Sequence, residues 1–152
     1  MPQNDLVKLL RQISSSLPGD AGTVPQEISG LSFAQIYLLG ELFELERTGR
    51  EPLSLSVLSR ETGFSKATVC ATLKKLRKGG LIRTQMDDAD NRRKEITLTQ
   101  RAWDVEESIT QYISALDRAL CAGISSTDLG TMMQSLRVIL QNTRKSGSRV
   151  PQ

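Results

Sequence analysis

Residues 58–99 read LSRETGFSKATVCATLKKLRKGGLIRTQMDDADNRRKEITLT, and this stretch decides the fold. Apolar residues at helical spacing predict a short helix over 53–61, followed by a turn at 62–64. Gly63 in that turn can adopt the positive φ that a tight junction between two helices needs. A second, basic helix is predicted over 65–78, where two glycines end it. The order predicts a helix-turn-helix.

A charged hairpin is expected to follow the second helix. The segments 81–86 and 95–99 have β-type patterns, and the second of them alternates apolar residues with threonines. The polar residues 87–94 between them form the predicted tip of a wing. A helix that fits a major groove, followed by a charged hairpin that reaches a neighbouring groove, is typical of proteins that read DNA.

The rest of the chain is predicted to be mainly helical. Helices are expected over 4–17, 31–48, 100–122 and from Ser125 or Ser126 to about Thr143, with a loop over 18–30 and a disordered tail over 146–152. Ser32 and Gln35 have the spacing of a capping box at the start of the second of these helices, and Ser54 or Ser56 can cap the short helix of the helix-turn-helix. The expected fold class is mainly α with a small β-hairpin, a winged helix-turn-helix flanked by terminal dimerisation helices.

Four parts of the chain are predicted from this pattern. They are an N-terminal dimerisation helix and loop over 1–30, a winged helix-turn-helix over 31–99, C-terminal dimerisation helices over 100–145, and the tail. The amphipathic helices at both ends lie outside the winged unit, and their apolar faces need a partner. The same helices of a second copy would supply one in a two-fold dimer. The alternative is that they fold back on their own domain.

Composition excludes several classes of function. The chain of 152 residues has no histidine, which removes the commonest general base and the commonest zinc ligand. Its two cysteines have no CxxC spacing. We therefore expect no metal, no cofactor and no enzymatic activity. The N-terminus has no signal-peptide pattern and no apolar run is long enough for a membrane span, so a cytoplasmic protein is expected.

The charge is unevenly distributed along the chain. Residues 60–101 hold eleven Lys and Arg against five Asp and Glu, whereas the rest of the chain holds nine against twelve. A basic middle between acidic ends indicates a localised surface that binds anions such as nucleic acid. The alternative is an ordinary solvated surface.

The predicted second helix of the helix-turn-helix carries most of the candidate DNA contacts. At about 100° per residue, its outward face and flank hold Ser65, Lys66, Ala67, Thr68, Cys70, Ala71, Lys74 and Lys75. Small side chains at 67 and 71 would let the helix enter a groove about 12 Å wide. The hydroxyls and Lys66 can reach base edges or phosphates. The phosphate backbone would be met by Lys74, Lys75, Arg77 and Lys78. The alternative is that basic residues such as Lys78 only complement the dipole of the helix.

The predicted wing adds three basic residues, Arg92, Arg93 and Lys94. Asp90 lies two residues before Arg92 and can pair with it, which would fix the direction of the guanidinium. An oriented arginine suits the narrow, negative minor groove. The alternative for Asp90 and Asn91 is simple turn chemistry.

Part of the chain resembles the winged-helix core of the multiple antibiotic resistance regulator (MarR) family. The segments that carry this resemblance are LSRETGFSKATV, LKKLRKGGLI and DADNRRKEITLT. The segment CAGISSTDLGTMMQSLRVILQN resembles the closing helix of that family, and the likeness covers about 31–143. It implies a homodimer that places two recognition helices in successive major grooves of a pseudo-palindromic operator in double-stranded DNA. It also implies a repressor that a small aromatic or anionic effector, or an oxidant, releases from DNA.

Two alternatives remain open from the sequence. Cys70 lies four residues from both Lys66 and Lys74 on the predicted DNA-binding helix, so oxidation of its thiol could block DNA binding. The competing interpretation is an inert small residue on the flank of the helix. The alternative function is a winged-helix protein-interaction or dimerisation module that does not bind DNA.

Overall fold

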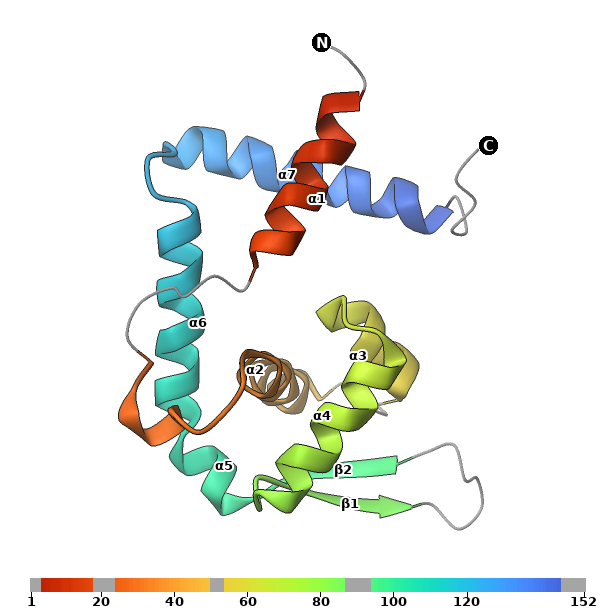
Figure 1. Ribbon diagram of the computed structural model, residues 1–152, viewed down its shortest axis with the longest axis vertical. Coiled ribbons are helices and arrows are strands. Elements are labelled where there is room, and N and C mark those ends of the chain that lie inside the picture. Colours follow the sequence, from red (N-terminus) through yellow and green to blue (C-terminus); the bar gives the residue numbers. More distant parts are fainter. Residues whose placement is uncertain (1–3, 18–23, 50–53, 87–93, 146–152) are drawn as a thin grey trace. The chain divides into compact units, whose positions relative to one another are not determined.

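The computed structural model describes residues 4–17, 24–49, 54–86 and 94–145. In chain order the elements are α1 (Asn4–Ser16), the 3-10 turn η1 (Gln26–Ile28), α2 (Phe33–Thr48), α3 (Leu55–Thr62), α4 (Lys66–Lys78), β1 (Ile82–Met86), β2 (Lys94–Leu98), α5 (Gln100–Asp104), α6 (Glu106–Leu120) and α7 (Ser126–Lys145). The predicted fold class is confirmed (Figure 1). The chain divides into two compact units, Met1–Leu116 and Asp117–Gln152.

The helix α2 is the centre of the first unit. The capping box predicted at its start is present, since the Ser32 Oγ accepts from the Gln35 backbone N–H at 3.2 Å and the Gln35 side chain accepts from the Ser32 N–H at 2.8 Å. Gly49 ends the helix at φ +64°. Apolar residues lie around much of its circumference, and the buried ones are Ile36, Leu38, Leu39, Leu42, Phe43 and Leu45. A helix of this kind must be covered on several sides.

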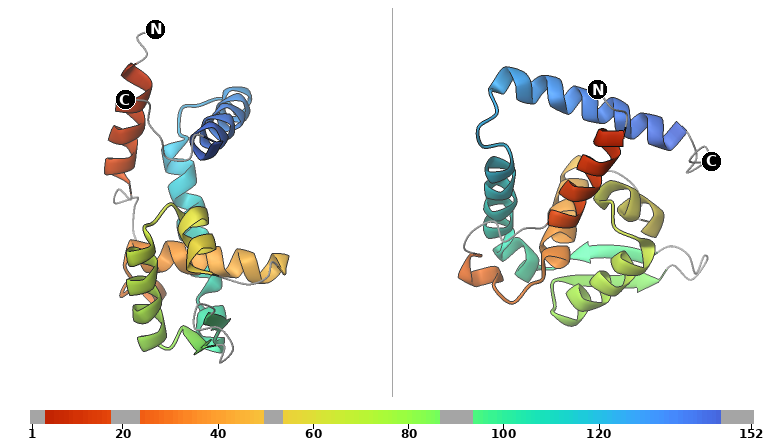
Figure 2. Two further views of the ribbon diagram at one scale, coloured as in Figure 1. Left: turned by 90° about the vertical axis from the view of Figure 1, so that its right-hand side faces the viewer. Right: turned by 45° about the horizontal axis from the view of Figure 1, so that its top comes forward.

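The helices α3 and α4 provide part of that cover. Both contact α2 and each other, and α4 also contacts β1 (Figures 1 and 2). Four apolar side chains of these helices, Leu58, Val69, Leu73 and Leu76, are buried, and Leu55, which the helical spacing also turns inward, is partly buried. They join the side chains of α2 in a single apolar core. The packing fixes which face of α4 remains exposed.

The wing strands pair as an antiparallel hairpin. The register runs from Ile82 opposite Leu98 at the root to Met86 opposite Lys94 at the far end. Leu81 and Ile82 at the root are buried, which joins the hairpin to the core. The Thr99 hydroxyl closes this end, because it donates to the carbonyls of Gly80 and Leu81 at 2.7 and 3.1 Å.

The prediction of a single helix over 100–122 is wrong, because the structure has two helices there, α5 and α6, separated at Val105. The Val105 N–H donates to the Ala102 carbonyl, and the residue has φ −104° and ψ 4°. The break allows Trp103 to pack on Phe43, with ring centroids 5.1 Å apart, while Ile109 is buried one turn into α6. A straight helix would turn these residues to different sides. Glu106 at the start of α6 forms an ion pair with Arg47 of α2.

The contact between α2 and α6 depends on Gly40. A Cβ on this residue would lie 2.5 Å from the Cδ1 of Ile113 and 3.9 Å from the Cγ2 of Ile109. The glycine is therefore required by the close approach of the two helices, and its φ is not in the left-handed region.

The loop predicted over 18–30 is also wrong in one part. Residues 26–28 form the 3-10 turn, and the Ile28 side chain is 1% exposed. The sequence does not indicate this turn, because the prolines and glycines of the same stretch are typical of a loop.

The terminal helices differ from the core helices in exposure. In α7, which the Ser125 hydroxyl caps by accepting from the Asp128 N–H, no residue is buried. Large apolar side chains remain exposed on α1, around the end of α6 and on α7: Leu6, Val7, Leu9, Ile13, Leu17, Leu120, Ile124, Met133, Leu136, Val138 and Leu140. Within the described ranges no helix is both long and apolar enough to cross a membrane.

Candidate nucleic-acid interface

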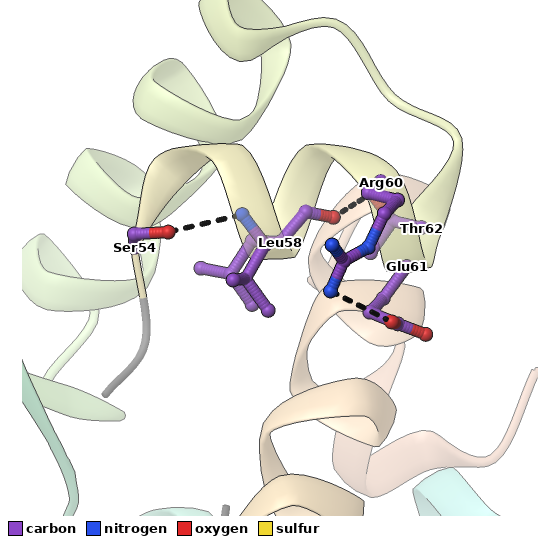
Figure 3. A network of polar contacts seen from close by, with 6 residues as sticks. Ser54, Leu58, Arg60, Glu61 and Thr62 are labelled. Carbon is purple, nitrogen blue, oxygen red and sulfur yellow. Dashed lines mark hydrogen bonds and ion pairs between the residues drawn. The ribbon is translucent and has the colours of Figure 1, made fainter. Parts of the chain in front are cut away.

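The first helix of the helix-turn-helix is held at both ends by its own side chains (Figure 3). The Ser54 Oγ accepts from the Val57 N–H at 3.1 Å at the N-terminal end. The Thr62 hydroxyl donates to the Leu58 carbonyl at 2.6 Å at the C-terminal end. The helix is only eight residues long, and Gly63 is its C-cap, where the turn begins.

The turn between α3 and α4 is closely tied. Gly63 has φ +76°, as predicted for this junction. The Ser59 hydroxyl donates to the Phe64 carbonyl at 2.5 Å, and the Thr62 hydroxyl accepts from the Phe64 N–H at 3.2 Å. The Phe64 ring packs edge-on against Tyr37 of α2 at 5.7 Å. The turn therefore fixes the direction in which α4 leaves.

Two hydroxyls meet at the first turn of α4. Ser65 caps the helix, since its Oγ accepts from the Thr68 N–H at 3.1 Å. The same Oγ lies 2.9 Å from the Thr68 Oγ1, in the geometry of a donor to it. The Thr68 hydroxyl then keeps its own proton for an outside acceptor. A base edge or a phosphate oxygen is such an acceptor.

The remaining candidate residues of α4 share one surface. Ser65, Lys66, Ala67, Thr68, Ala71, Lys74 and Lys75 are exposed, and Cys70 is half-buried at the edge. Thr72, opposite them, is buried, and its hydroxyl donates to the Thr68 carbonyl at 2.7 Å, so it has no free donor. The structure brings the predicted α4 residues together on a face that is small and polar at its start and basic toward its end.

The predicted wing contacts lie mostly outside the described residues. Asp90, Arg92 and Arg93 fall in that stretch, and Lys94 is the first residue of β2. Their assignment stays a prediction. The hairpin strands that would carry them are in place, with the far end of the hairpin at the pair Met86 and Lys94.

The aromatic contacts behind the turn were not predicted. Phe33 stacks on Tyr37 with centroids 5.6 Å apart, and Tyr37 in turn contacts Phe64. The spacing of Phe33 and Tyr37, four residues apart on one helix face, is the signal that would have found them. Both cysteines are free thiols, and the described part of the chain holds no group of three metal-ligating side chains.

Removing the cap of α4 should weaken the helix-turn-helix. We expect Ser65→Ala to lower the free energy of unfolding by about 0.5–2 kcal/mol, because the Thr68 N–H loses its acceptor. Urea denaturation of the purified protein measures this loss. Ser65→Asn is the control, since asparagine caps helices equally well. Equal midpoints for the alanine and wild-type proteins would contradict the role of Ser65.

The arrangement of α3, the turn, α4 and the hairpin defines a winged helix-turn-helix protein. Residues 29–93, which contain all of these elements up to the wing, match the model of the MarR family. Over these residues the chain is similar to the MarR family.

Solved structures have the same fold over most of the chain. A complex of S. aureus MepR with DNA is 23% identical, with a TM-score of 0.67 over 88% of this chain and 93% of that one. Bordetella bronchiseptica BpsR, described with the regulation of its DNA binding by 6-hydroxynicotinic acid, is 21% identical, with a TM-score of 0.70 over 90% and 96%. A MarR-family transcriptional regulator from Silicibacter pomeroyi is 21% identical, with a TM-score of 0.63 over 93% and 88%.

Proposed function

We propose that the chain is a dimeric transcriptional regulator that binds double-stranded DNA at a pseudo-palindromic operator, and that it acts as a repressor in the cytoplasm without enzymatic activity. The exposed face of α4 carries this proposal. It is the one face of the helix-turn-helix that is at once exposed, small at its start and basic at its end. A helix with those properties fits a major groove and its phosphate walls.

Each part of the interface has a distinct task. Ser65, Lys66, Ala67, Thr68, Cys70 and Ala71 would meet base edges, and Lys74 and Lys75 would meet phosphates. Arg92, Arg93 and Lys94 would enter the adjacent minor groove, with Asp90 orienting Arg92. MepR, a structural relative, has been crystallised with DNA.

The dimer would use the helices at the two ends of the chain. The apolar residues exposed on α1 and α7 need a partner, and full burial of one such side chain contributes about 1.5–3 kcal/mol. A second copy related by a two-fold axis offers the same surface in return. Residues 1–30 and 100–145 would then serve dimerisation and 31–99 DNA binding.

Release from DNA would follow the binding of a small aromatic or anionic effector. The BpsR structure, with its description of regulation by 6-hydroxynicotinic acid, supports an effector of this kind. Oxidation of Cys70 is a second route to release, because the free thiol lies half-buried at the edge of the exposed face of α4. An adduct there would add bulk where the helix must enter the groove.

Footprinting on the DNA upstream of the gene tests the proposal. We expect two protected half-sites about 10 base pairs apart, one for each α4 of the dimer. The logarithm of the affinity should fall linearly with the logarithm of salt concentration, with a slope no steeper than about −11 if all six proposed lysines and arginines of each protomer meet phosphates. A protein that ignores every duplex at low salt would instead be the interaction module without DNA binding.

Arg92→Ala should weaken duplex binding about 5- to 150-fold, because it removes a guanidinium from the minor groove and leaves α4 in place. Fluorescence anisotropy with a labelled operator measures the change. Asp90→Ala should give a smaller loss of the same kind, since it removes only the orienting carboxylate. Unchanged affinity of Arg92→Ala would refute the role of the wing, and Arg11→Ala, on α1, is the control for lost charge.

A further inference from the structure

An open hollow of about 700 Å³ lies at the root of the wing. It is formed where α4 ends, β1 begins and α5 starts, and these three segments come together in Figure 1. Arg77, Arg83 and Arg101 line it, one from each segment. Neither Arg83 nor Arg101 is among the DNA contacts proposed above.

The three arginines are without acidic partners in the part of the chain that is described. The ion pairs found there are Arg47 with Glu106 and Arg60 with Glu61. The carboxylate that is nearest to Arg101 in the sequence belongs to Asp104, and it accepts a hydrogen bond from the Gln100 side chain at 3.0 Å. Three like charges around one concave surface repel each other and concentrate a positive potential there. A bound anion would relieve that repulsion.

The walls of the hollow leave the guanidinium groups accessible. Ile82, which also lines the hollow, is 1% exposed and joins this wall to the apolar core. The Thr84 hydroxyl accepts from the Arg77 Nη1 at 3.4 Å, which turns this guanidinium toward β1. Gly80 has φ +76° and no side chain, and a Cβ there would lie 4.0 Å from the Arg101 Nη1. The guanidinium of Arg101 therefore lies beside open space.

We propose that this hollow binds a phosphate group, held by Arg77, Arg83 and Arg101. Guanidinium groups are planar forks whose N–H pairs match two oxygens of a phosphate, and several of them can share a dianion. The size of the hollow admits a phosphorylated small molecule. The proposal does not depend on DNA binding, since it is made for the free protein.

The phosphate can come from two sources, a phosphorylated small molecule or the backbone of the duplex. Arg77 is eleven residues from Lys66, about 16 Å along α4 from the first turn that would enter the groove. The hairpin root is four residues, about 13 Å, from the end that carries the wing tip. These distances separate the hollow from the first turn and from the far end of the hairpin, whereas Lys74 and Lys75, the proposed phosphate contacts, lie within three residues of Arg77 on α4.

The first test measures pyrophosphate binding by the full chain without DNA, at constant ionic strength. We expect saturable binding by calorimetry, with amide shifts at residues 80–84 and 99–101 in NMR spectra. Arg83→Gln and Arg101→Gln should each weaken it at least about tenfold, because each removes a charge-assisted hydrogen-bond donor. Arg60→Gln is the matched control, since it removes the same charge from an exposed arginine outside the hollow. An equal loss of pyrophosphate affinity in all three variants, or the absence of saturable binding, would contradict the proposed site.

The second test identifies the source of the phosphate. If a phosphorylated small molecule occupies the hollow, Arg83→Gln and Arg101→Gln will bind an operator duplex with wild-type affinity and salt dependence. If a backbone phosphate occupies the hollow instead, each variant will make the slope of log affinity against log salt concentration shallower by about one for each arginine replaced. Failure of all duplex binding would contradict the proposed function and leave the pyrophosphate result standing.

Discussion

The double variant Leu136→Asp with Leu140→Asp is expected to be monomeric and to lose at least about a hundredfold in affinity for the operator. Both side chains are exposed on one face of α7, at 37% and 48%. Carboxylates buried without partners in a dimer interface are strongly unfavourable. The two α4 helices of a dimer bind two half-sites with an effective concentration that a monomer lacks, and this avidity is typically about 10²–10⁴.

Light scattering and anisotropy with a labelled operator measure the two effects. The matched control is Gln134→Asp with Gln141→Asp, because these residues lie on the opposite face of α7 and add the same charge. The control should remain dimeric and should bind DNA nearly as well as the wild type. Circular dichroism checks that both variants are folded. A dimeric Leu136→Asp, Leu140→Asp protein would place the interface elsewhere.

The elements with local signals could be predicted from the sequence. The capping box of Ser32 and Gln35, the cap at Ser65 and the positive φ of Gly63 each depend on residues within a few positions of one another. The exposed face of α4 follows from the helical period, because Val69, Leu73 and Leu76 fix the opposite side. Chemistry that a few neighbouring residues determine is visible in a single sequence.

The features that the sequence did not predict depend on contacts between distant segments. Apolar spacing continues through Val105, so the break between α5 and α6 is visible only once Trp103 is placed on Phe43. Ile28 is buried because the core reaches it, without any periodic pattern of its own. The hollow at the wing root joins three arginines that are six and eighteen residues apart in the chain. No local pattern shows that these side chains share one surface.

The second large effect concerns stability. Phe43→Ala is expected to lower the free energy of unfolding by about 3–5 kcal/mol, because it leaves a cavity where α2 meets α5. The Phe43 side chain is 1% exposed, and its ring lies at a tilted angle of 49° to that of Trp103. The substitution removes the aromatic contact as well as the buried apolar surface.

Urea denaturation with tryptophan fluorescence suits this measurement, because Trp103 is the only tryptophan of the chain and reports on the contact itself. Phe43→Leu is the control, since it keeps much of the volume and should lose clearly less stability than the alanine variant. The exposed face of α4 does not include Phe43, so under native conditions the folded fraction of either variant should keep its affinity for the operator. A loss below about 1 kcal/mol for Phe43→Ala would contradict the central place of this contact. Equal losses for alanine and leucine would instead assign the effect to the aromatic pair alone.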